Sequence, residues 1–395
     1  MTELEAVPGV GPAAAKRLRE VFITTAEILS VQNPSELQAQ TKLGEATVAK
    51  IIRNAREVSG KFGFKSGIEL EKHQALTPRL KFGIDSLDKK LYGGLEVGSI
   101  VELYGSARGG KTFLSHQLAV RCQLPYDQGG LEGRVLWLDT ESSFKTTHIR
   151  ANAVRWGLDP DIALANISVA PIALSSQIEE YAQQIQLMLA EGEYKMLIID
   201  SFTGLFRAEY TGIGNLASRQ YSINALLNWM RRLGLATDAM FVYTNQVTTQ
   251  ITSYGGNPSA PVGGHVVAHA SDYRFFTRVG AQGKRKISLK DNSGVPEFDV
   301  EVEIGWGGIY QDKTEKKNTE KMIFEKLGSL NASDEDEAEK ESTEKKVSKK
   351  TKESPKEEVI TEETETKTEE EDTEEIVSPE VKVSKKKKVS KEATA

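Results

Sequence analysis

The sequence is poor in cysteine and has no long apolar run. Cys122 is the only cysteine among 395 residues, which excludes a disulfide framework and a zinc site built on cysteines. Its place in the apolar stretch AVRCQL indicates a small buried side chain in a reducing compartment. No apolar run reaches transmembrane length and the N-terminus lacks a signal-peptide core, so we expect a soluble, cytoplasmic protein with no membrane partner.

The end of the chain lacks aromatic residues and glycine. No aromatic residue follows Phe324 and no glycine follows Gly328, whereas Glu, Lys, Thr and Ser dominate. Such a segment buries too little apolar surface to offset the entropy lost on ordering, so we predict a disordered charged tail over residues 313–395. Two roles remain open for it: acidic blocks that compete with DNA for basic loops, or a solvating tail without a specific partner.

Net charge is nearly absent from the rest of the chain. The formal net charge is −6, but residues 331–395 alone hold 21 acidic and 14 basic residues. This leaves 36 acidic and 37 basic residues in residues 1–330. Nucleic-acid binding by this part therefore needs a local basic patch rather than a general positive charge.

The most informative stretch is SIVELYGSARGGKTFLSHQL, residues 99–118. An apolar run of strand character breaks at a glycine, and a helix-competent segment follows. The spacing G-x-x-x-x-G-K-T matches the phosphate-binding loop, in which backbone N–H groups and a lysine hold phosphates and the threonine hydroxyl binds Mg²⁺. A glycine-rich turn without catalytic meaning is the weaker alternative. The predicted ATP-binding residues are Gly105, Ser106, Ala107, Arg108, Gly109, Gly110, Lys111 and Thr112.

Three more apolar segments of strand character are each followed directly by polar residues. The strand VLWL precedes Glu141, our candidate for the general base that activates the attacking water. A helix-capping role suits the nearby Asp139 or Ser142 better. The strand KMLII precedes Asp200, which with Thr112 is predicted to hold the Mg²⁺ shell. A third strand precedes Gln246, which is placed to sense the γ-phosphate. With Lys111, Glu141 and Gln246 form the predicted catalytic set.

The alternation of strands with helix-length segments predicts an α/β core over residues 76–312. We expect a mostly parallel sheet with helices on both faces. In such a sheet the ligand lies at the carboxyl ends of the strands, where all four motifs are found. This agreement supports an ATPase.

Residues 1–60 are expected to form a small all-helical domain, followed by a linker over residues 61–75. The turn PGVGP before a helix that carries Lys and Arg resembles the helix–hairpin–helix motif, whose glycines bring backbone N–H groups to DNA phosphates. A packing module whose glycines only make a turn is the alternative. The basic residues that could assist are Lys16, Arg17, Arg53 and Arg56.

Two irregular segments are candidates for DNA contact. Residues 207–219, RAEYTGIGNLASR, contain two arginines and a tyrosine. Residues 248–265, TTQITSYGGNPSAPVGGH, form a long segment rich in Gly and Pro. Within it, Tyr254 offers a ring on which single-stranded nucleic acid can stack.

Taken together, these residues resemble the RadA/RecA family of recombinases. The similarity runs from about Leu4 to about Gln311 and includes GFKSG, QLPYDQGGLEG, LWLDTE, FRAEYTG, TNQV and GNPSAPVGGHVVAH. It implies a RecA-type core that uses ATP and Mg²⁺. It also implies a nucleoid-associated homo-oligomer, filament or ring, which binds single-stranded DNA and exchanges strands with homologous double-stranded DNA.

The resemblance implies roles for residues that face other subunits or the base. Phe64 and Gly67 match the polymerisation motif, in which the phenylalanine inserts into the next subunit. His148 stands where the family stacks an arginine on adenine, and Asp291 where the neighbouring subunit caps the nucleotide.

The resemblance also implies the DNA-binding set. The first loop contributes residues between 207 and 219, the second lies at residues 248–264, and Gln246 and His269 match the positions that couple the γ-phosphate to DNA. The implied DNA-binding residues are Arg207, Tyr210, Arg219, Tyr254, Gly263 and Gly264.

Four departures from the family pattern bear on an alternative. The interior of the phosphate loop, GSARGGKT, differs from the usual one although its defining residues are present. Ile213 replaces an arginine of the first loop, Ser293 replaces the proline of the nucleotide cap, and His148 replaces the stacking arginine. Ile213 and Ser293 favour a paralogue that acts as a recombination mediator without exchanging strands, whereas the intact Phe64 motif and the N-terminal module oppose it. A RecA-type helicase or signalling ATPase would explain the phosphate loop alone.

Overall fold

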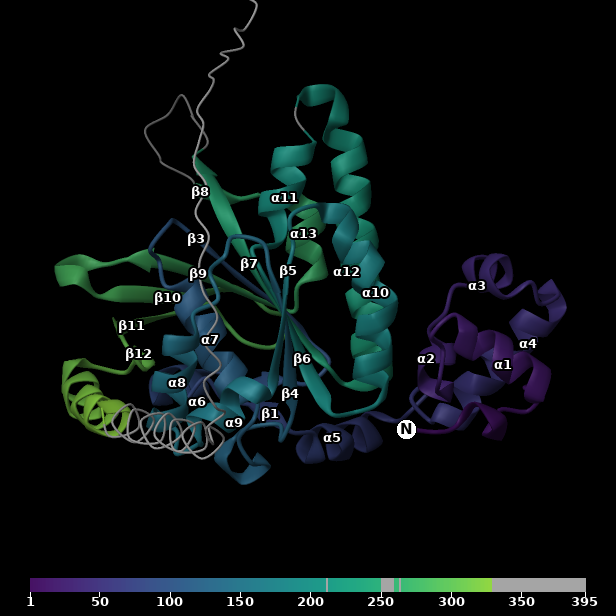
Figure 1. Ribbon diagram of the computed structural model, residues 1–395, viewed down its shortest axis with the longest axis horizontal. Coiled ribbons are helices and arrows are strands. Elements are labelled where there is room, and N and C mark those ends of the chain that lie inside the picture. The colour runs from purple at the N-terminus through teal and green to yellow at the C-terminus, as the bar shows by residue number, and fades with distance from the viewer. Residues whose placement is uncertain (211, 250–258, 263, 329–395) are drawn as a thin grey trace, which may run out of the picture. The chain divides into compact units, whose positions relative to one another are not determined.

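The computed structural model describes residues 1–210, 212–249, 259–262 and 264–328 (Figure 1). The N-terminal part is helical. Pro12 occupies the first turn of its first α-helix and Pro34 that of α3, where a missing N–H costs nothing. Its core is made of apolar side chains such as Leu18, Leu29 and Ile51. The elements are η1 Leu4–Ala6, α1 Pro12–Glu20, α2 Ala26–Ser30, α3 Pro34–Thr41 and α4 Glu45–Ser59.

The linker contains a helix, α5 Gly67–Leu76, which its composition did not predict. Ser66 and Glu69 form a capping box: each side chain bonds to the other residue's backbone N–H. None of these ten described residues is buried. The helix therefore depends on its cap rather than on an apolar face, which explains why hydrophobic periodicity gave no signal.

The core is an α/β fold around one mostly parallel sheet, as predicted. The strand order is β12-β11-β10-β9-β3-β7-β6-β4-β5, and β8 pairs with β7. Strands β9, β3, β7, β6, β4 and β5 are parallel, whereas β10, β11 and β12 continue the sheet in antiparallel pairs. The strands are β1 Arg79–Leu80, β2 Leu95–Glu96, β3 Ile100–Gly105, β4 Arg134–Asp139, β5 Ile167–Pro171, β6 Tyr194–Asp200, β7 Met240–Thr249, β8 Ser259–Pro261, β9 Tyr273–Val279, β10 Arg285–Asp291, β11 Phe298–Gly305 and β12 Gly308–Tyr310.

Helices cover both faces of this sheet (Figure 1). Along β6, Leu197 and Ile199 join one apolar cluster, which includes side chains of α10 and α12, while Met196 and Ile198 join another, with α7 and α8. This alternation is the period of two that a strand buried on both faces requires. The helices are α6 Asp85–Lys90, α7 Lys111–Arg121, η2 Tyr126–Gln128, α8 Thr146–Arg155, α9 Pro160–Ala165, α10 Ser175–Ala190, α11 Phe202–Glu209, η3 Ile213–Asn215, α12 Leu216–Thr237, α13 Gly264–Ala270 and η4 Ala281–Gly283.

The predicted disordered tail starts too early. Residues 313–328 are helical. Ile323 is fully buried against Ala151 and Val154 of α8, and Glu315 pairs with Arg155 at 2.7 Å. The Lys- and Glu-rich composition is typical of a disordered segment, so these few contacts with α8 could not be predicted from it. The rest of the predicted tail lies outside the described residues. In the described part of the chain, no helix is long and apolar enough to cross a membrane.

Candidate nucleotide and DNA site

The phosphate loop joins the end of β3 to the start of α7. A Cβ atom added to Gly105 (φ +152°) would lie 1.9 Å from the carbonyl oxygen of Thr277, so this position admits no side chain. Gly110 (φ +105°) has the left-handed backbone that favours glycine. The loop therefore leaves its backbone N–H groups accessible at the N-terminus of a helix, an arrangement that fits a triphosphate.

Lys111 points back into the loop. Its Nζ donates hydrogen bonds to the carbonyl oxygens of Gly105 and Ser106, both at 3.0 Å. Burial lowers the pKa of Lys111, and the nearby carboxylates of Asp200 and Glu141 oppose that shift. A desolvated ammonium group held among loop carbonyls is well placed to exchange these weak partners for phosphate oxygens.

Asp200 lies at the end of β6, beside the predicted Mg²⁺ position. Burial raises its pKa, while hydrogen bonds from Thr244, Ser143 and Thr112 lower it and the charge of Glu141 raises it further. The Ser143 hydroxyl donates to the carboxylate at 2.8 Å. Among the described residues no group of three or more His, Cys, Asp or Glu side chains could hold a metal ion. One carboxylate and one hydroxyl nevertheless suit Mg²⁺, which usually keeps waters and phosphate oxygens as ligands.

Glu141 and Gln246 are in direct contact. Gln246 Nε2 donates to Glu141 Oε1 at 3.0 Å, and the Ser201 hydroxyl donates to the same oxygen at 2.7 Å. Gln246 is also the register partner of Gly105, the first residue of the phosphate loop. The predicted base, the predicted sensor and the loop thus meet at the carboxyl edge of the sheet, as expected for parallel strands.

His148 lies close to the phosphate loop, among aromatic rings. Its ring centroid is 4.7 Å from that of Phe113, which directly follows Thr112. It is 5.8 Å from the ring of His116 and 5.5 Å from that of Trp306. The predicted base-stacking residue is therefore adjacent to the site, but it belongs to an aromatic row that the sequence did not reveal.

His116 predicts a pH dependence of stability. It is 1% exposed and stacks on Trp137, and its Nε2 accepts the N–H of Lys145 at 3.1 Å. Burial lowers its pKa to about 3; the charges of His148 and Lys145 also lower it, whereas Asp139 and a backbone bond raise it. Between its ordinary pKa and its lowered pKa, His116 is protonated in the unfolded state but neutral in the folded state. The free energy of unfolding therefore falls as the pH drops through this interval.

We expect the free energy of unfolding to be about 2 kcal/mol lower near pH 5 than near pH 7 from this group alone. Urea denaturation at the two pH values measures the difference. The variant His116→Gln retains an acceptor for the Lys145 N–H but does not titrate, so its stability should change less over this interval. An equal loss in both proteins would show that His116 is not the cause.

The residues predicted to bind DNA are only partly within the described chain. Arg207 is exposed in the last turn of α11, whereas Tyr210 is partly buried and stacks 6.4 Å from Phe206. Arg219 lies in the first turn of α12 and Gly264 begins α13, which also carries His269. Tyr254 and Gly263 lie outside the described residues. The described positions leave Arg207 best exposed for a phosphate contact.

The four basic residues predicted to assist DNA binding in the N-terminal domain differ in their contacts. Arg17 donates to the carbonyl oxygen of Lys42 at 3.3 Å and Arg56 to that of Ser30 at 3.0 Å, so both help to hold the domain together. All four side chains are exposed, but in the described part of the chain Lys16 and Arg53 make no such contact with a backbone carbonyl. They are the better candidates for DNA phosphates.

Phe64, Gly67 and Asp291 do not join the nucleotide site of their own chain. Phe64 is fully exposed in the linker, and Gly67 begins α5. Asp291 ends β10 as the register partner of Arg274, near the amino end of β9, whereas Thr277 further along β9 pairs with Gly105 of the phosphate loop. Any action of these residues on a nucleotide or a pocket therefore requires a second copy of the chain.

Several polar residues that support the site were not predicted. Ser143 and Ser201 hold the two carboxylates of the site. The fully buried Glu102 on β3 pairs with Arg274 at 2.7 Å and accepts a hydrogen bond from Asn245 at 2.7 Å. The one available signal was position: Ser201 directly follows Asp200, and Asn245 directly precedes Gln246.

Comparisons with known proteins identify the family. The Rad51 family profile matches residues 74–312, and the profile of the SAM-like helix-hairpin-helix tandem matches residues 1–57. The chain is 37% identical over 324 residues to "DNA repair and recombination protein RadA" of Methanocorpusculum labreanum (strain ATCC 43576 / DSM 4855 / Z). That alignment covers 78% of this chain and 98% of the relative. The chain therefore belongs to the Rad51 family of RecA-type proteins.

Proposed function

We propose that this chain is a RadA-type DNA repair and recombination protein. It binds ATP with Mg²⁺, assembles on single-stranded DNA in the cytoplasm, at the nucleoid, and catalyses pairing and strand exchange with homologous double-stranded DNA. Family membership, the name of the relative and the helix–hairpin–helix match support the DNA-directed part of this proposal. The geometry at the carboxyl edge of the sheet supports the ATPase.

Hydrolysis follows from the positions of the chain's own groups. The loop N–H groups and Lys111 hold the phosphates, and Thr112 with Asp200 would hold Mg²⁺, which neutralises charge on the phosphate oxygens. Glu141 takes a proton from a water whose oxygen attacks the γ-phosphorus, and the bond to the β-phosphate oxygen breaks as ADP leaves. Ser201 and Gln246 orient the carboxylate for this step.

The observation that carries the DNA dependence is the contact between Gln246 and Glu141. Gln246 lies on β7, and the predicted second DNA-binding segment begins only two residues later, at residue 248. If DNA binding to this segment changes the end of β7, the change would therefore reach the general base, Glu141, through one hydrogen bond. Because coupling free energies are reciprocal for binding, ATP in turn favours the DNA-bound form of the segment.

We test this proposal by measuring ATP turnover with and without single-stranded DNA. We expect DNA to raise the turnover number by roughly tenfold or more, because the contact orients a general base whose full contribution is about 10²- to 10⁴-fold. The variant Gln246→Ala removes the contact and should reduce the ratio of the two rates. Equal turnover with and without DNA in the unmodified protein would contradict the proposal.

Assembly is proposed to use Phe64 and a pocket beside β5. The Phe64 side chain is exposed to its full extent, at 111% of the reference area. An apolar pocket of about 150 Å³ lies between β5 and α10, lined by residues that include Leu138, Ala170, Tyr181 and Met188. A cavity of this size accepts a benzene ring. We propose that Phe64 of one copy fills this pocket on the next.

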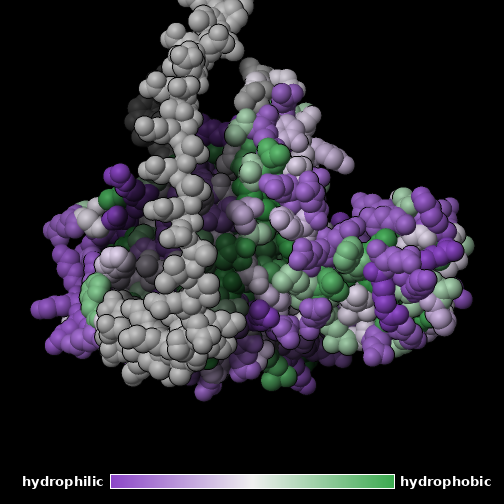
Figure 2. Space-filling model, in the orientation of Figure 1, coloured by the Kyte–Doolittle hydropathy of each residue, from purple (hydrophilic) through white to green (hydrophobic). Residues whose placement is uncertain are grey.

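The sheet edge provides a second reason for this contact. Among the described residues β5 pairs only with β4, so its outer edge offers free backbone groups. Figure 2 shows hydrophobic surface over β5 beside the largely hydrophilic face of α10. An extended segment that carries an aromatic anchor could add to such an edge, and the residues around Phe64 form no regular element.

Asp291, remote from its own chain's phosphate loop, is proposed to cap the nucleotide of a neighbouring copy.

A mediator without strand-exchange activity is the second candidate function. It is favoured by Ile213 and Ser293, which replace residues of the first DNA loop and of the nucleotide cap. The two candidates differ in joint-molecule formation with homologous duplex DNA and ATP. A mediator forms none.

A further inference from the structure

Trp306 is an exposed tryptophan in a row of aromatic rings that begins at the phosphate loop. It lies between β11 and β12, and 48% of its surface is exposed. Its ring is 5.5 Å from that of His148 at an interplanar angle of 36° and 6.1 Å from that of Phe324. His148 in turn contacts Phe113, the residue after Thr112. The row therefore extends outward from the residue next to the predicted Mg²⁺ ligand.

The turn that carries Trp306 also packs against the phosphate loop itself. A Cβ atom added to Gly110 would lie 2.8 Å from Cδ1 of Ile304 and 3.8 Å from Cδ1 of Ile309. These two isoleucines flank the turn. The position of Trp306 relative to the phosphate loop is therefore set by direct packing.

Trp306 is the one side chain that this turn presents. The turn reads Gly305-Trp306-Gly307-Gly308, and a Cβ atom at each glycine would meet a neighbour at short range. The nearest atoms are Glu320 Oε1 at 2.0 Å for Gly305, Ile323 Cδ1 and Tyr310 Oη at 2.6 Å for Gly307 and Gln117 Oε1 at 2.4 Å for Gly308. Neighbouring side chains thus pack closely against the backbone at the three glycines, whereas the Trp306 side chain is exposed to solvent.

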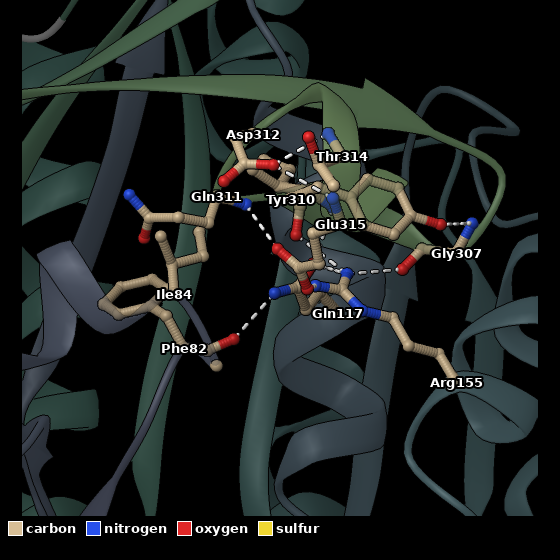
Figure 3. Close-up of polar contacts among 12 residues, drawn as sticks. Phe82, Ile84, Gln117, Arg155, Gly307, Tyr310, Gln311, Asp312, Thr314 and Glu315 are labelled. Atoms are coloured by element: carbon tan, nitrogen blue, oxygen red, sulfur yellow. Dashed lines mark hydrogen bonds and ion pairs between the residues drawn. The ribbon is translucent and has the colours of Figure 1, made fainter. Parts of the chain in front are cut away.

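A buried polar network holds the turn in place (Figure 3). Arg155, whose side chain is 3% exposed, donates to the carbonyl oxygens of Gly307 and Ile309, both at 2.8 Å, and pairs with Glu315. The N–H of Gly307 donates to Tyr310 Oη at 3.0 Å. The buried guanidinium fixes the backbone that follows Trp306, and the N–H of Trp306 itself donates to Glu320 Oε1 at 2.8 Å, so the ring is presented with little conformational freedom.

We infer that the indole of Trp306, together with the imidazole of His148, forms the surface on which the base of a purine nucleoside triphosphate stacks. This inference rests on the proposed binding of ATP phosphates by the loop at residues 105–112. Stacking on a rigid aromatic ring contributes in proportion to overlap, so the larger purine base gains more than a pyrimidine. His148 is expected at the base from the family pattern, whereas Trp306 is a new contact that fixes the class of nucleotide.

Calorimetric titration of the full-length chain tests the inference, with ATP, CTP and inorganic tripolyphosphate, each with Mg²⁺. We expect Trp306→Ala to weaken ATP binding by roughly 10- to 100-fold and to reduce the preference for ATP over CTP. Binding of tripolyphosphate, which has no base, should not change. Trp306→Phe retains a stacking ring and should remain within about threefold of the unmodified protein. Tyr126→Ala removes an equally exposed aromatic ring on η2 and should have no effect.

The outcomes distinguish two roles for Trp306, stacking on the base of the nucleotide and structural support of the phosphate loop. An equal loss of ATP and tripolyphosphate binding in Trp306→Ala, whose folding is checked by thermal melting, would show that Trp306 only supports the loop and would overturn the inference. Unchanged ATP binding would overturn it as well. If the unmodified protein bound neither ATP nor tripolyphosphate, the phosphate-loop assignment would itself have failed. Quenching of tryptophan fluorescence by ATP, lost in Trp306→Phe, would support stacking.

Discussion

Replacing Glu141 by glutamine is expected to lower the rate of ATP hydrolysis by about 10²- to 10⁴-fold, the contribution of a positioned general base. Glutamine is close in shape and retains an oxygen that can accept the hydrogen bonds of Ser201 and Gln246. The site should therefore keep its geometry and its affinity for ATP while losing the group that takes the proton. Single-turnover phosphate release measures the rate, and a binding titration with ATP measures the affinity.

The control for this variant is Glu193→Gln. Glu193 has a side chain that is 66% exposed and forms a surface ion pair with Arg134 at 3.3 Å, so its charge contributes little. We expect the control to hydrolyse ATP at the rate of the unmodified protein. If Glu141→Gln did the same, the proton acceptor would have to be another group. If it lost ATP binding, the carboxylate would be serving the nucleotide rather than the water.

The sequence predicted those parts of the site that depend on short spacings. Gly105, Gly110, Lys111 and Thr112 lie within eight consecutive positions, and the local backbone alone makes them a loop. Glu141, Asp200 and Gln246 are far apart in the chain, but each follows a buried strand. Parallel pairing brings the carboxyl ends of such strands to one edge, so a correct fold class was enough to group these three residues.

The parts that were not predicted depend on pairs of residues that no pattern connects. Ser201 reaches a carboxylate 60 positions earlier, and the carbonyl oxygen of Trp306 lies 3.3 Å from Nδ1 of His148, 158 positions earlier. The first contact follows from the pairing of β4 with β6, and the second from the antiparallel extension β10, β11 and β12. A sequence can show that a tryptophan lies between glycines, but not which ring it faces.

The helix of residues 313–328 shows how composition misleads at a domain boundary. Its sequence is rich in Lys and Glu, as in a disordered segment. One buried side chain, Ile323, and one paired carboxylate, Glu315, nevertheless attach it to α8. Sparse anchors of this kind have too little periodicity to be recognised before the partner surface is known.

The second large effect is expected for Phe64→Ala, which should convert assemblies into single protomers. A buried aromatic anchor contributes about 2 to 4 kcal/mol to an interface, so each contact should weaken by roughly 30- to 1000-fold. Because the Phe64 side chain has no burial to lose within its own chain, the stability of the protomer should stay the same. Light scattering after size exclusion and electron microscopy with ATP and single-stranded DNA measure the assembly. Thermal melting measures the fold.

The pocket provides the complementary variant, Ala170→Arg. Ala170 lines the apolar pocket beside β5, and a charged side chain there would block the entry of a ring. Each variant alone should fail to assemble, because one of the two surfaces is missing at every contact. An equimolar mixture should form dimers and nothing longer, since Phe64 of the Ala170→Arg chain can still enter the intact pocket of the Phe64→Ala chain. Tyr92→Ala, which removes another highly exposed aromatic ring, should assemble normally.

This mixing experiment separates direct insertion from an indirect effect. If Phe64 acted only by ordering its own linker, the two variants would not complement each other, and the mixture would contain protomers alone. If another surface dominated assembly, Phe64→Ala would still form filaments visible by electron microscopy. Dimers in the mixture, with protomers in each separate sample, require that the ring of one chain occupies the pocket of another. Such a contact joins two different surfaces and can repeat from chain to chain, which gives a ring if the rotation between neighbours closes and an open filament if it does not.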